Sequence, residues 1–199
     1  MLLEHILLKA AASEIDYKID TQSILSNINS STKLIFIANP NNPTSTYLDK
    51  QALRLLIEKI PKNIVLVIDA AYAEFADASD YDNSFNLANE FENVLITRTF
   101  SKAYSLAGLR LGWGYGSKQL IEILKKLRPP FNITPGAIAA GIAALYDNKH
   151  LNQVVEHNNK IKSWFIDEIN TLGFKAYQTQ ANFVFVIIPE KERQNASLV

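Results

Sequence analysis

Three short apolar runs rich in β-branched residues constrain the fold more than any other feature of this 199-residue chain. They occupy positions 34–38 (LIFIA), 64–68 (IVLVI) and 94–97 (VLIT). Continuous runs of this length, bounded by polar or turn residues, are typical of strands buried on both faces of a parallel sheet. Segment 49–60, between the first two runs, has apolar residues at helical spacing, and a mixed segment, 75–91, precedes the third. The order predicts a doubly wound α/β fold around a largely parallel sheet.

The second half of the sequence combines a long helical pattern with weaker strand signals. We expect further elements at 108–115 (strand), 120–127 (helix), 138–145 (helix), 150–172 (helix) and 183–188 (strand). The longest of these has a broad apolar face, and Gly173 follows it in the position of a helix C-cap. The residues of that face are Val154, Val155, Ile161, Trp164, Phe165 and Ile169. We therefore expect this helix to join a large domain, 1–148, to part of a smaller α+β domain, 149–199.

Composition excludes several classes of partner. Basic and acidic residues number 20 each and form no long run of one sign, so neither nucleic acid nor an anionic membrane is an expected partner. The chain has no cysteine, which excludes disulfides, thiolate metal sites and a cysteine nucleophile and fits the cytoplasm. The first residues lack the features of a signal peptide, and no apolar run reaches the roughly 18 residues of a membrane helix. We therefore expect a soluble, cytoplasmic protein that binds a small molecule and no metal.

Each of the three runs is followed directly by a polar motif, and open parallel sheets bind their ligands at the carboxyl ends of the strands. The first motif, NPNNPT (39–44), could be an ordinary turn, since Asn and Pro favour turns. The amide of Asn42 could instead donate a hydrogen bond to a ligand oxygen. In the second motif, DAAYAEF (69–75), Asp69 and Tyr72 could be a helix cap and a core aromatic. In a ligand site, the carboxylate would pair with a cationic nitrogen and the phenol would contact a neighbouring oxygen.

The third motif, TFSKAYSLAGLR (99–110), contains the residues with the most distinctive chemistry. A single lysine is usually solvated, and neighbouring hydroxyl residues usually belong to a loop. Here Lys102 is flanked by hydroxyl residues, and Arg110 follows eight positions later, where we expect a strand to begin. Arginine and hydroxyl groups bind phosphate oxygens, and a lysine whose pKa is lowered can form a Schiff base. The motif could therefore hold a phosphate and an aldehyde together.

In this order and at these spacings, the three motifs resemble those of the fold-type I aminotransferases, which depend on pyridoxal 5′-phosphate. Within that class they are most similar to the histidinol-phosphate aminotransferase family, and the similarity extends over residues 30–187. The resemblance implies that the large domain binds the cofactor. It also implies transfer of an amino group from histidinol phosphate, or from an aromatic amino acid as the next candidate, to 2-oxoglutarate. The intact enzyme would be a homodimer with its active site at the subunit interface.

The resemblance further implies a role for each motif residue. Lys102 would carry the cofactor and transfer a proton at the reacting carbon of the substrate. Asp69 would keep the pyridine nitrogen protonated, which strengthens the ring as an acceptor of electrons. Asn42 and Tyr72 would form hydrogen bonds with the 3′-oxygen of the cofactor. The expected phosphate ligands are Thr99, Ser101 and Arg110.

The sequence also departs from the family that it resembles. Ser45 stands where glycine is usual, at a turn that often needs a positive φ. The sequence lacks segments that resemble a glycine- and serine-containing phosphate loop, an N-terminal arm and the arginine for the substrate carboxylate, and the context of Arg193 does not match that arginine. The motifs also suit a related decarboxylase or lyase, a non-catalytic remnant, or a structural α/β domain without cofactor. Whether this chain is active by itself stays open at this stage.

Overall fold

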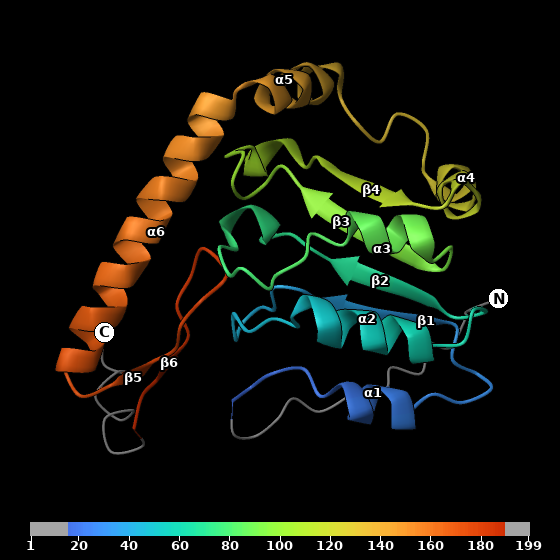
Figure 1. Cartoon of the computed structure of the whole chain (residues 1–199). Helices are drawn as coiled ribbons and strands as arrows, with labels where there is room; N and C mark the ends of the chain where they lie inside the picture. The colour runs from blue at the N-terminus through green and yellow to red at the C-terminus, as the bar shows by residue number, and fades with distance from the viewer. Residues whose placement is uncertain (1–15, 190–199) are drawn as a thin grey trace.

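The fold is organised around a four-stranded sheet with the strand order β1-β2-β3-β4. A computed structural model describes residues 16–189 of the chain (Figure 1). Strands β1 (Leu34–Ala38), β2 (Val65–Asp69) and β3 (Val94–Thr99) run parallel, and β4 (Gly112–Gly116) is antiparallel to β3. Each of the three apolar runs forms one of the parallel strands. The largely parallel α/β sheet expected from the sequence is therefore confirmed.

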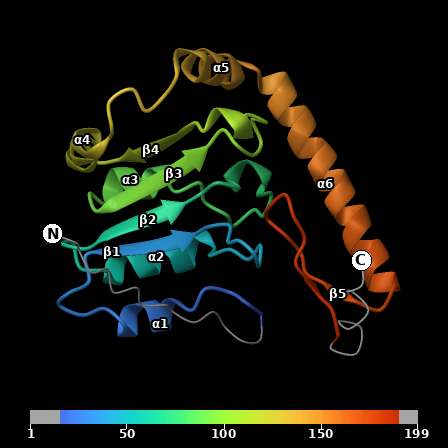
Figure 2. The same ribbon diagram turned by 180° about the vertical axis from the view of Figure 1, so that it is seen from behind.

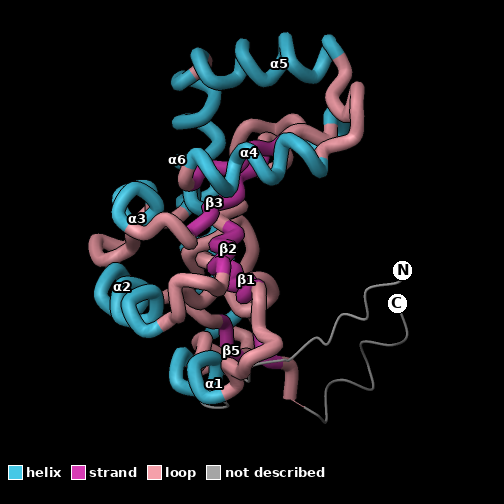
Figure 3. Tube along the Cα trace, turned by 90° about the vertical axis from the view of Figure 1, so that its right-hand side faces the viewer, coloured by secondary structure: helices cyan, strands magenta, loops and turns pink. Residues whose placement is uncertain are grey.

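Three helices cover one face of this sheet. Figure 3 shows α1 (Thr21–Ser26), α2 (Lys50–Lys59) and α3 (Phe85–Glu90) on the same side of the strands. Helix α2 begins where the side chain of Asp49 accepts a hydrogen bond from the Ala52 backbone N–H, the usual arrangement of an N-cap. Its buried residues recur at helical spacing and pack against the strands. They are Leu53, Leu56 and Ile57.

The opposite face of the sheet is less covered than the sequence predicts. Phe36 and Leu34 of β1 are 70% and 55% exposed, whereas Ile37, on the other face of the same strand, is buried. The expectation that this run is buried on both faces is therefore wrong. Strand β1 lies at the edge of the sheet, and no element within residues 16–189 covers this side of it.

The remaining helices lead away from the sheet toward a small hairpin. Figure 1 shows α4 (Lys118–Leu127) and α5 (Pro135–Tyr146) beyond β4, and the long α6 (Asn148–Thr171) running down the side of the molecule. After α6, strands β5 (Lys175–Ala176) and β6 (Val186–Ile187) form an antiparallel pair. Gly173 follows α6 with φ +82°, as its expected capping position requires. None of the helices among residues 16–189 combines the length and the apolar composition of a membrane-spanning segment.

The broad apolar face expected on α6 is only partly buried. Trp164, Ile161 and Phe165 are 57%, 43% and 38% exposed. The residues of α6 that are buried are Ile166 and, against expectation, Lys162. Seen from behind, the segment between β5 and β6 reaches back to the carboxyl ends of the parallel strands (Figure 2). This segment contacts α6, and residues of both line the second of the two cavities described next.

Candidate active site

The carboxyl ends of the three parallel strands surround an open cavity of about 520 Å³. All seven residues singled out from the sequence line this cavity. They are Asn42, Asp69, Tyr72, Thr99, Ser101, Lys102 and Arg110. Because parallel strands present their carboxyl ends at one edge, three motifs that are far apart in the sequence meet there.

The first motif combines a structural residue with a residue that points into the cavity. Asn39 is fully buried, and its side chain donates to the Leu48 carbonyl (3.3 Å) and accepts from the Leu48 N–H (2.9 Å). Asn42 is exposed, and its Nδ2 donates to the Tyr72 hydroxyl at 2.9 Å. Ser45 is buried with φ +57°, the positive value expected at this position. The turn is therefore structural at Asn39 and open to a ligand at Asn42.

The second motif follows β2 and presents a carboxylate beside a phenol. Asp69 is the last residue of β2, is exposed, and accepts a hydrogen bond from the Ala71 N–H at 3.2 Å. The short 3₁₀ helix η1 (Ala73–Phe75) begins after Tyr72 and has no side-chain cap, so the alternative of Asp69 as a helix cap is wrong. Tyr72 is buried, with its ring edge-on to Phe183 at 5.1 Å between centroids. The phenol is therefore held between Asn42 and the segment that precedes β6.

The third motif forms a compact loop that presents Lys102. The Ser101 N–H donates to Thr99 Oγ1 (3.0 Å), and the Ser105 N–H donates to the Lys102 carbonyl (2.9 Å). Lys102 Nζ lies 5.3 Å from the centre of the Tyr72 ring. Local hydrogen bonds therefore fix the backbone on both sides of the lysine and leave its amine near the phenol.

Arg110 differs from its prediction in conformation but not in location. It follows the 3₁₀ helix η2 (Ala107–Leu109) with φ +51°, and its Nη1 donates to the Ala107 carbonyl at 2.7 Å. Strand β4 begins only at Gly112, so the expectation that Arg110 enters a strand is wrong. The left-handed conformation of Arg110 turns the chain at the end of η2, and this turn keeps the side chain at the cavity.

The sequence did not predict a buried ion pair between Glu74 and Arg98, and Arg98 itself lines the cavity. Arg98 Nη2 donates to Glu74 Oε1 at 2.6 Å, and the two side chains are 9% and 8% exposed. The guanidinium also lies 5.7 Å from the ring centre of Phe85 and 5.6 Å from that of Trp113. The pair ties η1, which directly follows Tyr72, to β3, which precedes Lys102. Its only signal in the sequence is a charged residue within an apolar strand, which does not identify a partner.

Lys102 also borders a second cavity of about 500 Å³ on the side facing α6. Helix α6 contributes His150, His157 and Asn158, and Asn182 lies across from them. His150 Nε2 lies 3.2 Å from Ser105 Oγ, which connects the first turn of α6 to the lysine loop. No carboxylate among the described residues lines this cavity. The lysine therefore stands between two hollows of different composition.

A largely parallel α/β sheet with a lysine, a carboxylate, hydroxyl groups and a guanidinium at its carboxyl edge is the arrangement expected of the class of transferases that the motifs resemble. The chain belongs to the aminotransferase class I and II family, whose family model matches residues 8–198. It is 42% identical over 187 residues to histidinol-phosphate aminotransferase of Maricaulis maris, covering 94% of this chain and 52% of the relative. The chain therefore spans about half the length of the curated relatives that it matches.

Solved structures agree with this family. The histidinol-phosphate aminotransferase of Sinorhizobium meliloti in complex with pyridoxal-5′-phosphate superposes with a TM-score of 0.77 at 27% identity, covering 84% of this chain and 46% of that chain. The enzyme of the same name from Clostridium acetobutylicum gives a TM-score of 0.80 at 26% identity, covering 89% and 54% of the two chains. The fold is shared in both cases.

Proposed function

We propose that this chain is part of a pyridoxal-phosphate-dependent transaminase that moves an amino group from histidinol phosphate to 2-oxoglutarate. The observation that carries the proposal is the meeting of all seven motif residues around one cavity, with Lys102 on its wall. The names of the relatives support the choice of amino donor, and an aromatic amino acid is the second candidate. A cytoplasmic location and the division at residue 148 stay predictions.

The polar groups of the cavity match the functional groups of the cofactor one by one. The Asp69 carboxylate suits a protonated ring nitrogen, because an opposite charge nearby stabilises the protonated form. Asn42 and Tyr72, already hydrogen-bonded to each other, suit a ring oxygen. The hydroxyl, amide and guanidinium donors of Thr99, Ser101 and Arg110 suit a phosphate.

Bound at this edge, pyridoxal phosphate would supply a conjugated ring that accepts the electron pair left when the substrate carbon loses its proton. The chain would hold and move that proton with the Lys102 amine, which faces both cavities. Asp69 would keep the ring nitrogen charged, and Tyr72 would fix the orientation of the ring oxygen. The second cavity adjoins the same amine and has the size of a small-molecule site, so we place the approach of the amino donor there.

The first test is the absorbance spectrum of the purified chain after addition of pyridoxal phosphate, followed by borohydride reduction and peptide mapping. We expect a visible band that borohydride removes, with the label on Lys102 and no such label in Lys102→Ala. Label spread over surface lysines, or none, would favour the alternative of a non-catalytic remnant. With the label established, glutamate formation from 2-oxoglutarate is measured with histidinol phosphate and, separately, with an aromatic amino acid, and the faster reaction identifies the amino donor. Release of carbon dioxide from an amino-acid substrate would indicate a decarboxylase.

We also propose that the intact protein is a homodimer in which α4 and α5 contribute to the interface. Phe131, Tyr146 and Leu127 are 100%, 83% and 74% exposed, and large apolar side chains left exposed in this way mark interaction surfaces. Sedimentation of the chain should show self-association that weakens in Phe131→Ser combined with Tyr146→Ser. A monomer at every concentration, with or without these changes, would contradict this interface.

A further inference from the structure

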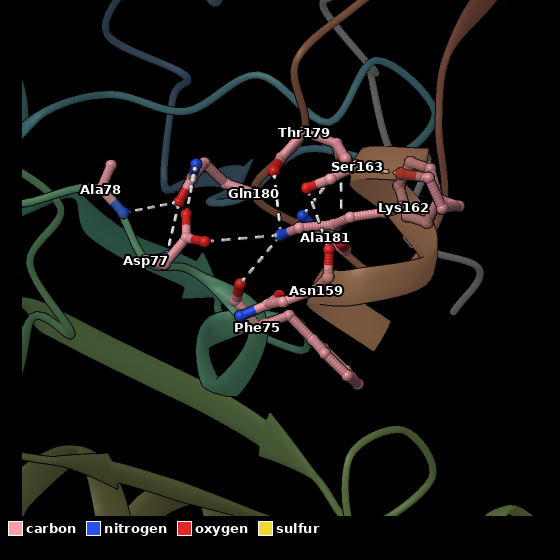
Figure 4. Close-up of polar contacts among 10 residues, drawn as sticks. Phe75, Asp77, Ala78, Asn159, Lys162, Ser163, Thr179, Gln180 and Ala181 are labelled. Atoms are coloured by element: carbon pink, nitrogen blue, oxygen red, sulfur yellow. Dashed lines mark hydrogen bonds and ion pairs between the residues drawn. The ribbon is translucent and has the colours of Figure 1, made fainter. Parts of the chain in front are cut away.

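Lys162 is a buried cation in a helix whose large apolar residues are partly exposed. Its side chain is 8% exposed, and its Nζ donates to the Thr179 carbonyl at 3.2 Å and to the Phe75 carbonyl at 3.5 Å (Figure 4). The nearest carboxylate oxygen, Asp77 Oδ2, lies 3.9 Å away. Burial lowers the pKa of the Lys162 ammonium, and the charge of Asp77 partly opposes that shift. The ammonium thus joins α6 to two segments that are distant in the sequence.

One of these segments, 179–181, is tied to the site by further hydrogen bonds. Gln180 Oε1 accepts from the backbone N–H groups of Asp77 (2.8 Å) and Ala78 (2.9 Å), and Gln180 Nε2 donates to Asp77 Oδ1 (3.0 Å), as Figure 4 shows. The Gln180 backbone N–H donates to the Ser45 carbonyl at 3.3 Å. The segment therefore contacts both the loop after η1 and the turn that carries Asn42.

The same segment also forms the packing surface behind the phenol. Ala181 is fully buried in one cluster with Tyr72, Phe75 and Ala103, the residue after Lys102. The ring of Phe183 is nearly perpendicular to the Tyr72 ring. The backbone between Ala181 and Phe183 is fixed by the Thr179 hydroxyl, which accepts from the Ala181 N–H (3.0 Å) and donates to the Phe183 carbonyl (2.7 Å). Displacement of this segment would free the Tyr72 ring on the side away from the cavity.

Stability alone gives little reason for a lysine at this position. Removing an ammonium from water is costly, and apolar residues of similar volume often replace buried ions without loss of stability. The two carbonyls accept hydrogen bonds only while the ammonium lies between them. The placement of the charge therefore favours a role in fixing the positions of Phe75 and Thr179 relative to α6.

We propose that Lys162 is a positioning residue of the cofactor site, which clamps segment 179–183 against Tyr72 and so keeps the phenol directed at the cofactor oxygen. This inference rests on the proposed function. The link runs from Lys162 through the Thr179 and Phe75 carbonyls to the Tyr72 ring, and from there to the Asn42 amide. Lys162 touches neither the cofactor nor the substrate.

The test compares Lys162→Met with Lys162→Arg in the cofactor-loaded chain, with Lys160→Met, an exposed position on the same helix, as the matched control. The readouts are the visible circular dichroism per bound cofactor, which reports how the ring is held, and the Kd for pyridoxal phosphate. We expect Lys162→Met to change the dichroism in the same direction as Tyr72→Phe and to raise the Kd about two- to tenfold, the range of one hydrogen bond. Lys162→Arg should restore most of both values, and Lys160→Met should change neither.

A second variant keeps the proposal testable if Lys162→Met fails to fold. Gln180→Leu breaks the bonds between the same segment and Asp77 and Ala78, and it should change the dichroism in the same direction. Wild-type signals in both Lys162→Met and Gln180→Leu would overturn the positioning role and leave the proposed function intact. Absence of any Lys102-linked band in the wild-type chain would instead count against the proposed function itself.

Discussion

Helices α2 and α5 both begin with a side-chain cap, yet the core residues of α2 are buried and the large apolar residues of α5 are exposed. Helix α2 starts at Asp49 and α5 at Thr134, and in each case the side chain accepts a hydrogen bond from a backbone N–H in the first turn. The core residues of α2 are at most 2% exposed, whereas Ile142 of α5 is 53% exposed. Local signals therefore determine where a helix forms, but only a packing partner determines what it buries. The α1–α3 side has that partner in the sheet, whereas the large apolar side chains of α4 and α5 have none within residues 16–189 that buries them.

The largest effect we predict concerns the buried ion pair between Glu74 and Arg98. In Glu74→Gln, Arg98 keeps its charge in a buried site without a counter-charge, and the loss should be about 3–5 kcal/mol in the free energy of unfolding. The matched control is Glu90→Gln, which removes an exposed partner of Arg54 and should cost less than about 1 kcal/mol. Urea denaturation followed by circular dichroism measures both. Equal small losses would mean that water reaches Arg98 and that the pair does not hold η1 to β3.

The contrast between the two helices can be measured directly with one truncation in each. Leu56 of α2 is 1% exposed, so Leu56→Ala should lower the free energy of unfolding by about 2–5 kcal/mol. Ile142→Ala in α5 removes a half-exposed side chain and should cost less than about 1 kcal/mol in the monomer. A large cost for Ile142→Ala at low protein concentration would contradict the comparison, whereas a cost that grows with concentration would support a second copy packed on α5.

A smaller effect is expected at Ser45, in the well-packed turn beside Asn42. Its φ of +57° is unfavourable for serine, so Ser45→Gly should stabilise the chain by up to about 1 kcal/mol. The hydrogen bond from Ser45 Oγ to the Thr44 carbonyl is lost in the variant and reduces the gain. Ser45→Ala, which loses that bond but keeps the strain, is the control and should be less stable than the wild type. The order glycine, serine, alanine in urea midpoints is the expected result.

Most of the fold could be predicted because its signals are local. The apolar runs identify β1 to β3, and the helical spacing identifies α2, α4, α5 and α6 to within a few residues. Helix α1 was missed because it is one short stretch with a single buried residue, Ile24. The strand expected at 183–188 is reduced to Val186–Ile187, because its partner β5 is only two residues long.

The candidate site also has a part that the sequence predicts and a part that it does not. The seven cavity residues follow the ends of recognisable strands, so their meeting point could be derived from the rules of parallel sheets. The contacts of Lys162 and the pairing of Glu74 with Arg98 could not, because each joins residues 17 or more positions apart through the packing of side chains. Amphipathic patterning even argues against burying Lys162, which lies beside the exposed Ile161. Long-range polar contacts of this kind leave no periodic signal in a single sequence.

The smallest effect we predict is a dependence of stability on pH at Lys162, the buried cation on the less covered side. The pKa of Lys162 lies below its ordinary value of 10.5 in the folded chain. Between the lowered pKa of the folded chain and the ordinary pKa of the unfolded chain, the unfolded chain therefore holds more protons than the folded one. The contribution of this residue to stability therefore rises as pH increases through that window, and below the window the cost of burying the charge is fully present. Urea midpoints of wild type and Lys162→Met, compared at about pH 8 and about pH 10, isolate this effect because the other titrating groups are shared. We expect the wild type to gain relative to the variant at the higher pH. A loss of wild-type stability relative to the variant at the higher pH would mean that Asp77 and the two carbonyls stabilise the ammonium more than burial destabilises it. The contacts of Lys162 would then stabilise the α6 side of the molecule, as the packed apolar residues stabilise the α1–α3 side.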